Sequence, residues 1–221
     1  DIRGLNFFRS YFFSPLPEIE IEKGETDKKN TTERNSILEY PYLILGVIAL
    51  FFYVGVEVLA GDTIGSYGTS LGMKLSETKI FASYTLSAMV IGYIIGILTI
   101  PKIISQSKAL TISSIVGIIF STAVLFTQGY TSILFIALLG LANALMWPAI
   151  WPLAIEGLGK FTKLGSALLI MSIAGGAILP LIYGRLADES IMGHQNAYFI
   201  FIPCYLFILF YSVNGFKIKK W

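Results

Sequence analysis

Six long apolar runs are the feature that most constrains what this chain can fold into. The runs cover about residues 42–64, 80–100, 109–127, 132–155, 165–186 and 197–213. A helix rises about 1.5 Å per residue, so roughly 20 apolar residues cross the hydrocarbon core of a bilayer. A helix also satisfies its backbone polar groups within its own segment, which the bilayer core requires. The sequence therefore predicts an all-α, polytopic membrane protein with six transmembrane helices in one bundle.

The composition agrees with a membrane protein. Of the 221 residues, 14% are charged, whereas soluble domains carry about a quarter charged residues. The single cysteine, Cys204, lies in an apolar run, which excludes a disulfide within these residues and argues against redox chemistry. The single histidine, His194, has no cysteine or second histidine nearby. We therefore expect no metal site and no cofactor.

Three regions differ in composition. Residues 1–40 hold an aromatic and basic stretch followed by a charged, aperiodic stretch, which is typical of a linker or mobile loop. Residues 41–215 would form the six-helix transmembrane bundle. Residues 216–221 would form a short tail. The composition thus predicts a linker or loop, one bundle and a short tail.

The distribution of lysine and arginine predicts the orientation in the membrane. Alternating spans place 13 of the 16 basic residues on one side, and loops rich in lysine and arginine face the cytoplasm. With an even number of spans, both ends of the chain would be cytoplasmic, in a plasma membrane such as the bacterial inner membrane. The remaining basic residues, on the opposite side, are Lys74, Lys79 and Arg185.

The fourth run carries the strongest candidate for a binding face. Asn143, Trp147 and Trp151 are four residues apart, which stacks them on one face of a helix. Pro148 and Pro152 each remove a backbone hydrogen bond one turn back, so we expect a kinked helix. In lipid, such breaks persist where neighbours or a water-filled cavity satisfy the freed carbonyls. The pattern favours a ligand path, and the alternative is that the indoles only pack helices together.

Two acidic residues, Glu57 and Asp62, lie in the first run. An ionised carboxylate near the bilayer centre costs about 2.5–3.5 kcal/mol on the lowest scales, so Glu57 should face the interior or a cavity. Glu57 could carry a proton, accept hydrogen bonds from sugar hydroxyls, or bond structurally to a neighbouring helix. Asp62 lies about 140° further around the helix and nearer the membrane surface, where the alternative to ion coupling is a helix-end acid.

Glycines are placed for close helix packing, without indicating a function. Gly92 and Gly96 form a G-x-x-x-G step in the second run. The fifth run holds the adjacent pair Gly175 and Gly176, and Gly184. We expect neighbouring helices to approach closely at each of these positions.

The sequence lacks the residue patterns of common enzyme classes. No carboxylate pair has a spacing that suggests hydrolysis, and a histidine-based triad would depend on His194 alone. Phosphate-binding and dinucleotide-binding glycine motifs are missing. Basic residues are spread along one membrane side rather than gathered with aromatic residues, which does not indicate a nucleic-acid surface. An enzyme and a nucleic-acid-binding protein are therefore disfavoured.

Two stretches resemble a known family. Residues 51–68, FFYVGVEVLAGDTIGSYG, resemble the first helix of the C-terminal half of sugar permeases in the major facilitator superfamily. Residues 146–188 are similar to the tenth and eleventh helices of the fucose permease and glucose/galactose transporter group, ending in a P-x-x-x-G-x-x-x-D pattern. The likeness covers about residues 40–215. Glu57, in V-G-x-E-V, is similar to the glucose/galactose branch, whereas fucose permeases tend to a neutral amide there.

The resemblance implies the C-terminal half of a twelve-helix secondary transporter, in which residues 1–40 would be the central cytoplasmic loop and residues 216–221 a cytoplasmic tail. A monosaccharide such as glucose, galactose or fucose would bind between two six-helix bundles and move by alternating access with proton symport. The implied partners are the sugar, a proton, the lipid bilayer and the N-terminal six-helix half. The family's proton-coupling acids lie in that other half, so a proton role for Glu57 rests on its burial alone.

The expected substrate-binding residues are Glu57, Asn143, Trp147 and Trp151, and the candidates for ion coupling are Glu57 and Asp62. The amide would bond sugar hydroxyls, and the indoles would cover the apolar faces of the ring. The alternative function is a self-assembling six-helix membrane channel or scaffold.

Overall fold

The computed structural model describes residues 36–220, which form α-helices and short 3-10 helices. The first 35 residues, which hold most of the predicted linker, and Trp221 lie outside the described residues. Within the described range, six helical segments are long and apolar enough to cross a membrane. They are Pro41–Ser70, Leu75–Thr99, Gln106–Phe126, Tyr130–Ile155, Gly159–Leu186 and Gly193–Lys217. The predicted all-α, polytopic membrane fold is confirmed.

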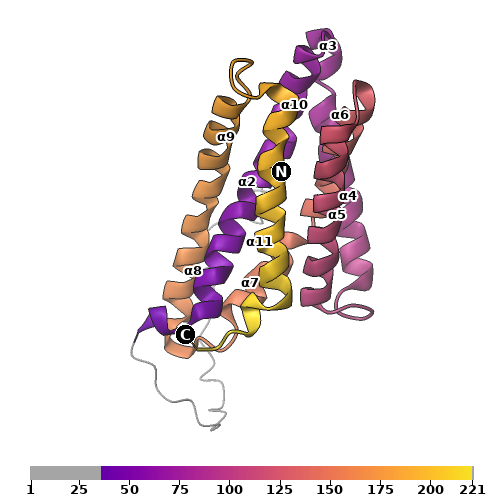
Figure 1. Cartoon of the computed structure of the whole chain (residues 1–221). Helices are drawn as coiled ribbons and strands as arrows, with labels where there is room; N and C mark the ends of the chain where they lie inside the picture. Colours follow the sequence, from indigo (N-terminus) through magenta and orange to yellow (C-terminus); the bar gives the residue numbers. More distant parts are fainter. Residues whose placement is uncertain (1–35, 221) are drawn as a thin grey trace, which may run out of the picture. The chain divides into compact units, whose positions relative to one another are not determined.

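Several of the spans are built from more than one helix (Figure 1). In chain order the elements are η1 (Ile37–Glu39), α2 (Pro41–Ser70), α3 (Leu75–Thr78), α4 (Phe81–Thr99), α5 (Gln106–Phe126), α6 (Tyr130–Asn143), α7 (Met146–Ile155), η2 (Gly159–Phe161), α8 (Thr162–Met171), η3 (Ser172–Ala174), α9 (Gly175–Leu186), α10 (Gly193–Ala197), η4 (Tyr198–Ile200), α11 (Phe201–Val213) and η5 (Gly215–Lys217). Breaks occur within the second, fourth, fifth and sixth spans.

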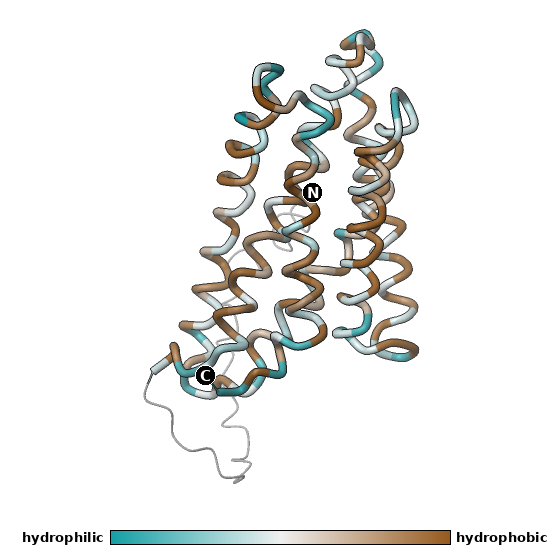
Figure 2. Tube along the Cα trace, viewed as in Figure 1, coloured by the Kyte–Doolittle hydropathy of each residue, from teal (hydrophilic) through white to brown (hydrophobic). Residues whose placement is uncertain are grey.

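Successive spans run in opposite directions and form one bundle (Figure 1). The start of α2, the α4–α5 loop, the α7–α8 connection and the end of α11 lie at one end of the bundle, named here the tail end. The opposite end, which carries α3 and α10, is named the α10 end. Hydrophilic residues gather at these two ends, and apolar residues fill the length between them (Figure 2).

Helix α2 is the centre of the packing. It contacts α4, α6, α7, α9 and α11, whereas α4 packs mainly on α6, and α5 packs on α6 and α11. The largest fully buried side chains include the tyrosines Tyr53, Tyr67, Tyr198, Tyr205 and Tyr211. The hydroxyls of Tyr67, Tyr198 and Tyr205 have side-chain hydrogen-bond partners on other helices, so specific polar contacts hold this core as well as apolar packing. The Tyr211 hydroxyl has no partner among the described residues.

Close packing at two glycines of α4 is confirmed. A Cβ atom at Gly92 would lie 2.6 Å from the Cβ of Ala144, and one at Gly96 would meet the Leu145 side chain. The G-x-x-x-G step therefore lets α4 lie directly against the fourth span, as small residues do between membrane helices.

The glycines of the fifth span behave in two ways. A Cβ atom at Gly175 would collide with the backbone carbonyl of Phe51, so the predicted close approach of α9 to α2 is confirmed there. At Gly184 the expectation was wrong, because an added Cβ would meet no described atom within 4 Å. Gly184 therefore faces open space among the described residues.

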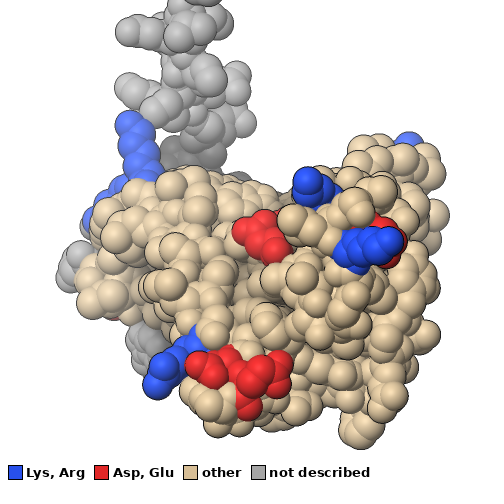
Figure 3. Space-filling model, turned by 90° about the horizontal axis from the view of Figure 1, so that it is seen from above, with Lys and Arg blue, Asp and Glu red and all other residues tan. Residues whose placement is uncertain are grey.

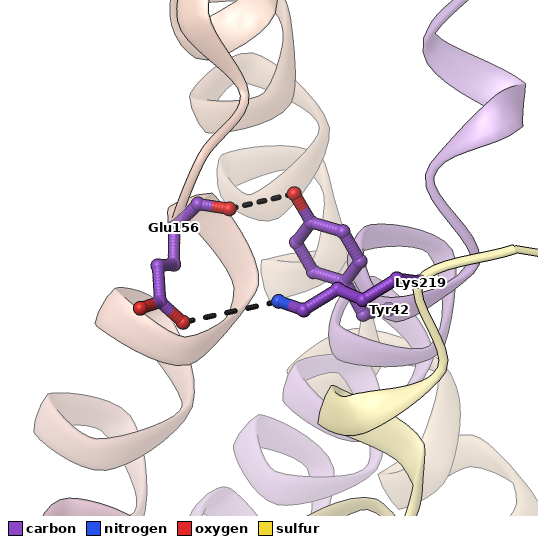
Figure 4. Close-up of polar contacts among 3 residues, drawn as sticks. All are labelled: Tyr42, Glu156 and Lys219. Carbon is purple, nitrogen blue, oxygen red and sulfur yellow. Dashed lines mark hydrogen bonds and ion pairs between the residues drawn. The ribbon is translucent and has the colours of Figure 1, made fainter. Parts of the chain in front are cut away.

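A three-residue contact joins separate segments at the tail end (Figure 4). The Tyr42 hydroxyl donates to the backbone carbonyl of Glu156 at 2.6 Å. The Lys219 ammonium lies 3.9 Å from the Glu156 carboxylate and 4.1 Å from the centre of the Tyr42 ring. An exposed ion pair contributes about 0–1 kcal/mol, so the hydrogen bond from buried Tyr42 is the stronger link between the first and fourth spans.

Candidate functional site

The fourth span is broken where its prolines predict a kink. Helix α6 ends at Asn143 and α7 begins at Met146. Pro148 has no N–H group to donate to the Ala144 carbonyl one turn back, whereas the Ala149 N–H still reaches the Leu145 carbonyl at 3.2 Å. The kink is therefore a short interruption of the helix between its two halves.

Two indoles stack directly after this break. The ring centroids of Trp147 and Trp151 are 5.7 Å apart and their planes differ by 18°. Together with Pro148 and Pro152, these half-buried side chains line a hollow of about 310 Å³. Small-molecule sites usually measure about 300–1,000 Å³. We refer to Trp147 and Trp151 as the indole platform.

Helix α2 places a carboxylate near the indole platform. Glu57 is half-buried, and its side chain interacts with Tyr53, one helical turn earlier. The Tyr53 ring in turn meets the Trp147 ring edge-on, with 6.3 Å between centroids. The structure thus brings three of the predicted site residues into one region, with Tyr53 between Glu57 and Trp147.

Two further tyrosines lie within electrostatic range of Glu57. They are Tyr93 of α4 and Tyr205 of α11. A phenol hydroxyl can donate a hydrogen bond to a carboxylate, so this surrounding suits either an ionised or a protonated acid. Sequence spacing could have indicated Tyr53, four residues before Glu57. Tyr93 and Tyr205 carry no such signal, because only the packing of distant helices brings them close.

Asn143 is fully buried at the end of α6. Its Oδ1 accepts a hydrogen bond of 2.8 Å from the Tyr205 hydroxyl, and within the described residues its Nδ2 has no partner. The side chains that line the platform hollow do not include Asn143. Asn143 therefore connects to the surroundings of Glu57 through Tyr205.

Asp62 is not brought next to Glu57. It lies on the same helix, α2, but its side chain is exposed. Five residues of helix separate the two carboxylates, which turns them toward different faces. Over residues 36–220, no group of three histidine, cysteine or acidic side chains could hold a metal ion.

Comparison with known proteins places these features in a family context, although no family model matches the chain. The chain is 35% identical over 201 residues to the glucose/galactose transporter of Brucella abortus, an alignment that covers 90% of this chain and 47% of that protein. It is 28% identical over 206 residues to the putative glucose/galactose transporter of Helicobacter pylori, covering 91% of this chain and 49% of that protein.

A third relative is the L-fucose-proton symporter of Haemophilus influenzae, which is 29% identical over 210 residues. That alignment covers 93% of this chain and 48% of the symporter. The chain therefore spans about half the length of the curated relatives that it matches.

The fold matches a solved transporter over a similar fraction. The crystal structure of FucP, a major facilitator superfamily transporter in the outward conformation, superposes with a TM-score of 0.74 at 22% identity. The match covers 81% of this chain and 42% of that chain. With the six apolar spans, these matches show that the chain is a multi-pass membrane protein with the fold of about half of a major facilitator superfamily transporter, and that its sequence is similar to those of glucose/galactose transporters and L-fucose-proton symporters.

Proposed function

We propose that this chain is the C-terminal half of a secondary active transporter that moves a monosaccharide such as glucose, galactose or fucose across the bacterial inner membrane. The observation that carries the proposal is the indole platform, which the Tyr53 ring connects to the half-buried Glu57. The names of the relatives, glucose/galactose transporter and L-fucose-proton symporter, support the sugar class. Both ends of the chain would be cytoplasmic, as the basic loops indicate.

The platform suits the chemistry of a sugar ring. The flat indoles of Trp147 and Trp151 offer a stacked apolar surface to the C–H face of the ring. Glu57 would accept hydrogen bonds from ring hydroxyls, and the unpartnered Nδ2 of Asn143 would donate one when the helix break opens. The opposite face of the sugar would be covered by the other six-helix half, since transporter sites lie between repeats near the membrane midplane.

Transport would follow alternating access with proton symport. A carboxyl group at membrane depth must be neutral, paired or hydrogen-bonded, so a proton that binds Glu57 would remove the cost of its charge. Glu57 is therefore our first candidate for ion coupling, with tyrosine hydroxyls close enough to interact with it. The exposed Asp62 is the second candidate.

The experiment is sugar uptake by proteoliposomes that contain the complete reading frame in which this chain lies. Glucose, galactose and fucose are offered separately under a pH gradient and then under a sodium gradient. We expect saturable accumulation of at least one sugar under the pH gradient. In Glu57→Gln, accumulation should fall at least tenfold while exchange of labelled for unlabelled sugar continues.

Two other variants complete this experiment. Glu77→Gln changes an exposed acid of the short helix α3 and should leave accumulation unchanged. Asp62→Asn measures whether the second acid contributes to coupling. Accumulation that is unaffected by Glu57→Gln would remove Glu57 from the coupling mechanism. If the folded protein takes up none of the sugars under either gradient, the proposed function is wrong.

A further inference from the structure

A second hollow lies at the α10 end of the bundle, separate from the indole platform. Its volume is about 400 Å³, within the usual range of about 300–1,000 Å³ for small-molecule sites. Its walls come from the last turns of α2, the end of α9 and the start of α10. The lining residues are Thr63, Ser66, Pro180, Tyr183, Gly184, Ala187, Asp188 and His194.

The small residues of α9 leave the space for this hollow. An added Cβ at Gly184 would meet no described atom within 4 Å, and Ala187 and Pro180 present only short side chains to the same space. Gly184 does not serve helix packing. Because it has no side chain, it leaves space along the α9 wall of the hollow.

Hydrogen-bonded hydroxyl groups form a fixed floor. The Thr63 hydroxyl lies 2.8 Å from the Tyr198 hydroxyl and donates to the Leu59 carbonyl at 2.6 Å. The Tyr183 hydroxyl donates to the backbone carbonyl of His194 at 3.3 Å, and its ring lies 5.1 Å from the Tyr198 ring. Because these groups are buried and bonded to three different helices, the floor is pre-formed.

The rim offers polar atoms for a ligand. Ser190 donates two hydrogen bonds to Oδ1 of Asp188, at 2.9 Å and 2.7 Å, and these bonds lower the pKa of the Asp188 carboxyl. Asp188 is thus held as an anion with its second oxygen available for another donor.

We propose that this hollow is a second binding site for a monosaccharide, distinct from the indole platform. A sugar supplies hydroxyl donors for the second carboxylate oxygen of Asp188 and for the Ser66 hydroxyl oxygen, whose own hydrogen is donated to the Thr63 carbonyl at 2.8 Å. An anionic ligand would be repelled by Asp188, and an apolar ligand would leave the polar rim unpaired. On this end of the bundle, acidic side chains gather in a patch with basic side chains beside it, which disfavours an anionic ligand (Figure 3). The choice of a sugar rests on the proposed function, whereas the hollow itself does not.

The test uses the 221-residue chain in lipid nanodiscs and reads the two sites separately. His194 is the single histidine in the sequence, so ¹⁵N-histidine labelling gives one imidazole signal that reports on the α10 end. Tryptophan fluorescence, in a background with Trp221→Phe, reports on the indole platform. Glucose, galactose and fucose are each titrated at constant pH.

We expect at least one sugar to shift the imidazole signal saturably. Gly184→Leu, whose side chain would fill the hollow, should weaken that response at least tenfold and leave the tryptophan response intact. Gly184→Ala is the matched control and should keep both responses. Circular dichroism and thermal melting confirm that each variant is folded.

Each combination of results decides between the two sites. A tryptophan response without an imidazole response would overturn the second site and leave the proposed function standing. The second site is also overturned by an imidazole shift that persists unchanged in Gly184→Leu. An imidazole response alone would support the second site. Absence of an imidazole response in folded protein would overturn the second site, whereas the indole platform, whose sugar we expect the other six-helix half to cover, is tested by the uptake experiment.

Discussion

The buried amide of Asn143 shows how far the role of a side chain can be inferred from residue spacing along a helix. The four-residue spacing of Asn143, Trp147 and Trp151 is visible in the sequence, and it led to the expectation of one shared binding face. In the structure the indoles line a hollow, whereas Asn143 is fully buried and bonded to Tyr205, 62 positions further along the chain. Helical periodicity predicts which direction a residue faces. It cannot predict what packs there, because that depends on distant segments.

The Tyr205–Asn143 hydrogen bond should make a measurable contribution to stability. In Tyr205→Phe, Oδ1 of Asn143 loses its donor in a buried place, which should cost about 1–3 kcal/mol. In Asn143→Leu the amide is removed, so a second loss of the tyrosine hydroxyl should cost little more. Unfolding measurements on both single variants and on the double variant give the coupling between the residues. Strictly additive losses would show that the bond is not a stabilising contact.

At the scale of helices, the sequence predicted which helices form more accurately than where each helix ends. The first apolar run was expected to finish near residue 64, but α2 continues to Ser70. Its last turns contain glycine, serine and threonine, which have weak helix propensity. They stay helical because Tyr67 packs against Tyr198 and bonds to Ser132, both on other helices. Tertiary contacts of this kind have no signature in local composition.

Two glycines of one helix also show that local sequence does not predict tertiary contacts. Gly175 and Gly184 both lie in α9, yet the first abuts the Phe51 backbone and the second faces open space. Their sequence surroundings predicted close approach for both. A small residue permits contact, but only the path of the helix determines whether a neighbour is there.

These two glycines should therefore respond oppositely to the same substitution. Gly175→Ala forces a methyl group against the α2 backbone and should destabilise the bundle by about 1–3 kcal/mol, the usual cost of overpacking. Gly184→Ala should be neutral or stabilise by up to about 1 kcal/mol, since alanine favours helix more than glycine. Thermal melting in a mild detergent compares the two variants directly. Equal destabilisation by both would contradict the packing described for α9.

At the scale of the whole molecule, the distribution of basic residues predicted the arrangement of the loops. The segments with most lysines lie at the tail end, where Tyr42, Glu156 and Lys219 join three of them. Six apolar runs sufficed to predict the bundle, because bilayer thickness fixes helix length. The surroundings of Glu57 could not be predicted in the same way, since its tyrosines come from three helices.

The central claim is that this six-helix bundle is one half of a sugar transporter and needs the other half. The most direct measurement compares gradient-driven sugar uptake by proteoliposomes that hold the 221-residue chain alone with uptake by proteoliposomes that hold the complete reading frame. A single bundle has no opposing wall for alternating access, so the chain alone should accumulate no sugar while the complete protein accumulates it saturably. Sugar-specific accumulation by the chain alone would contradict this account and favour a self-assembling six-helix protein.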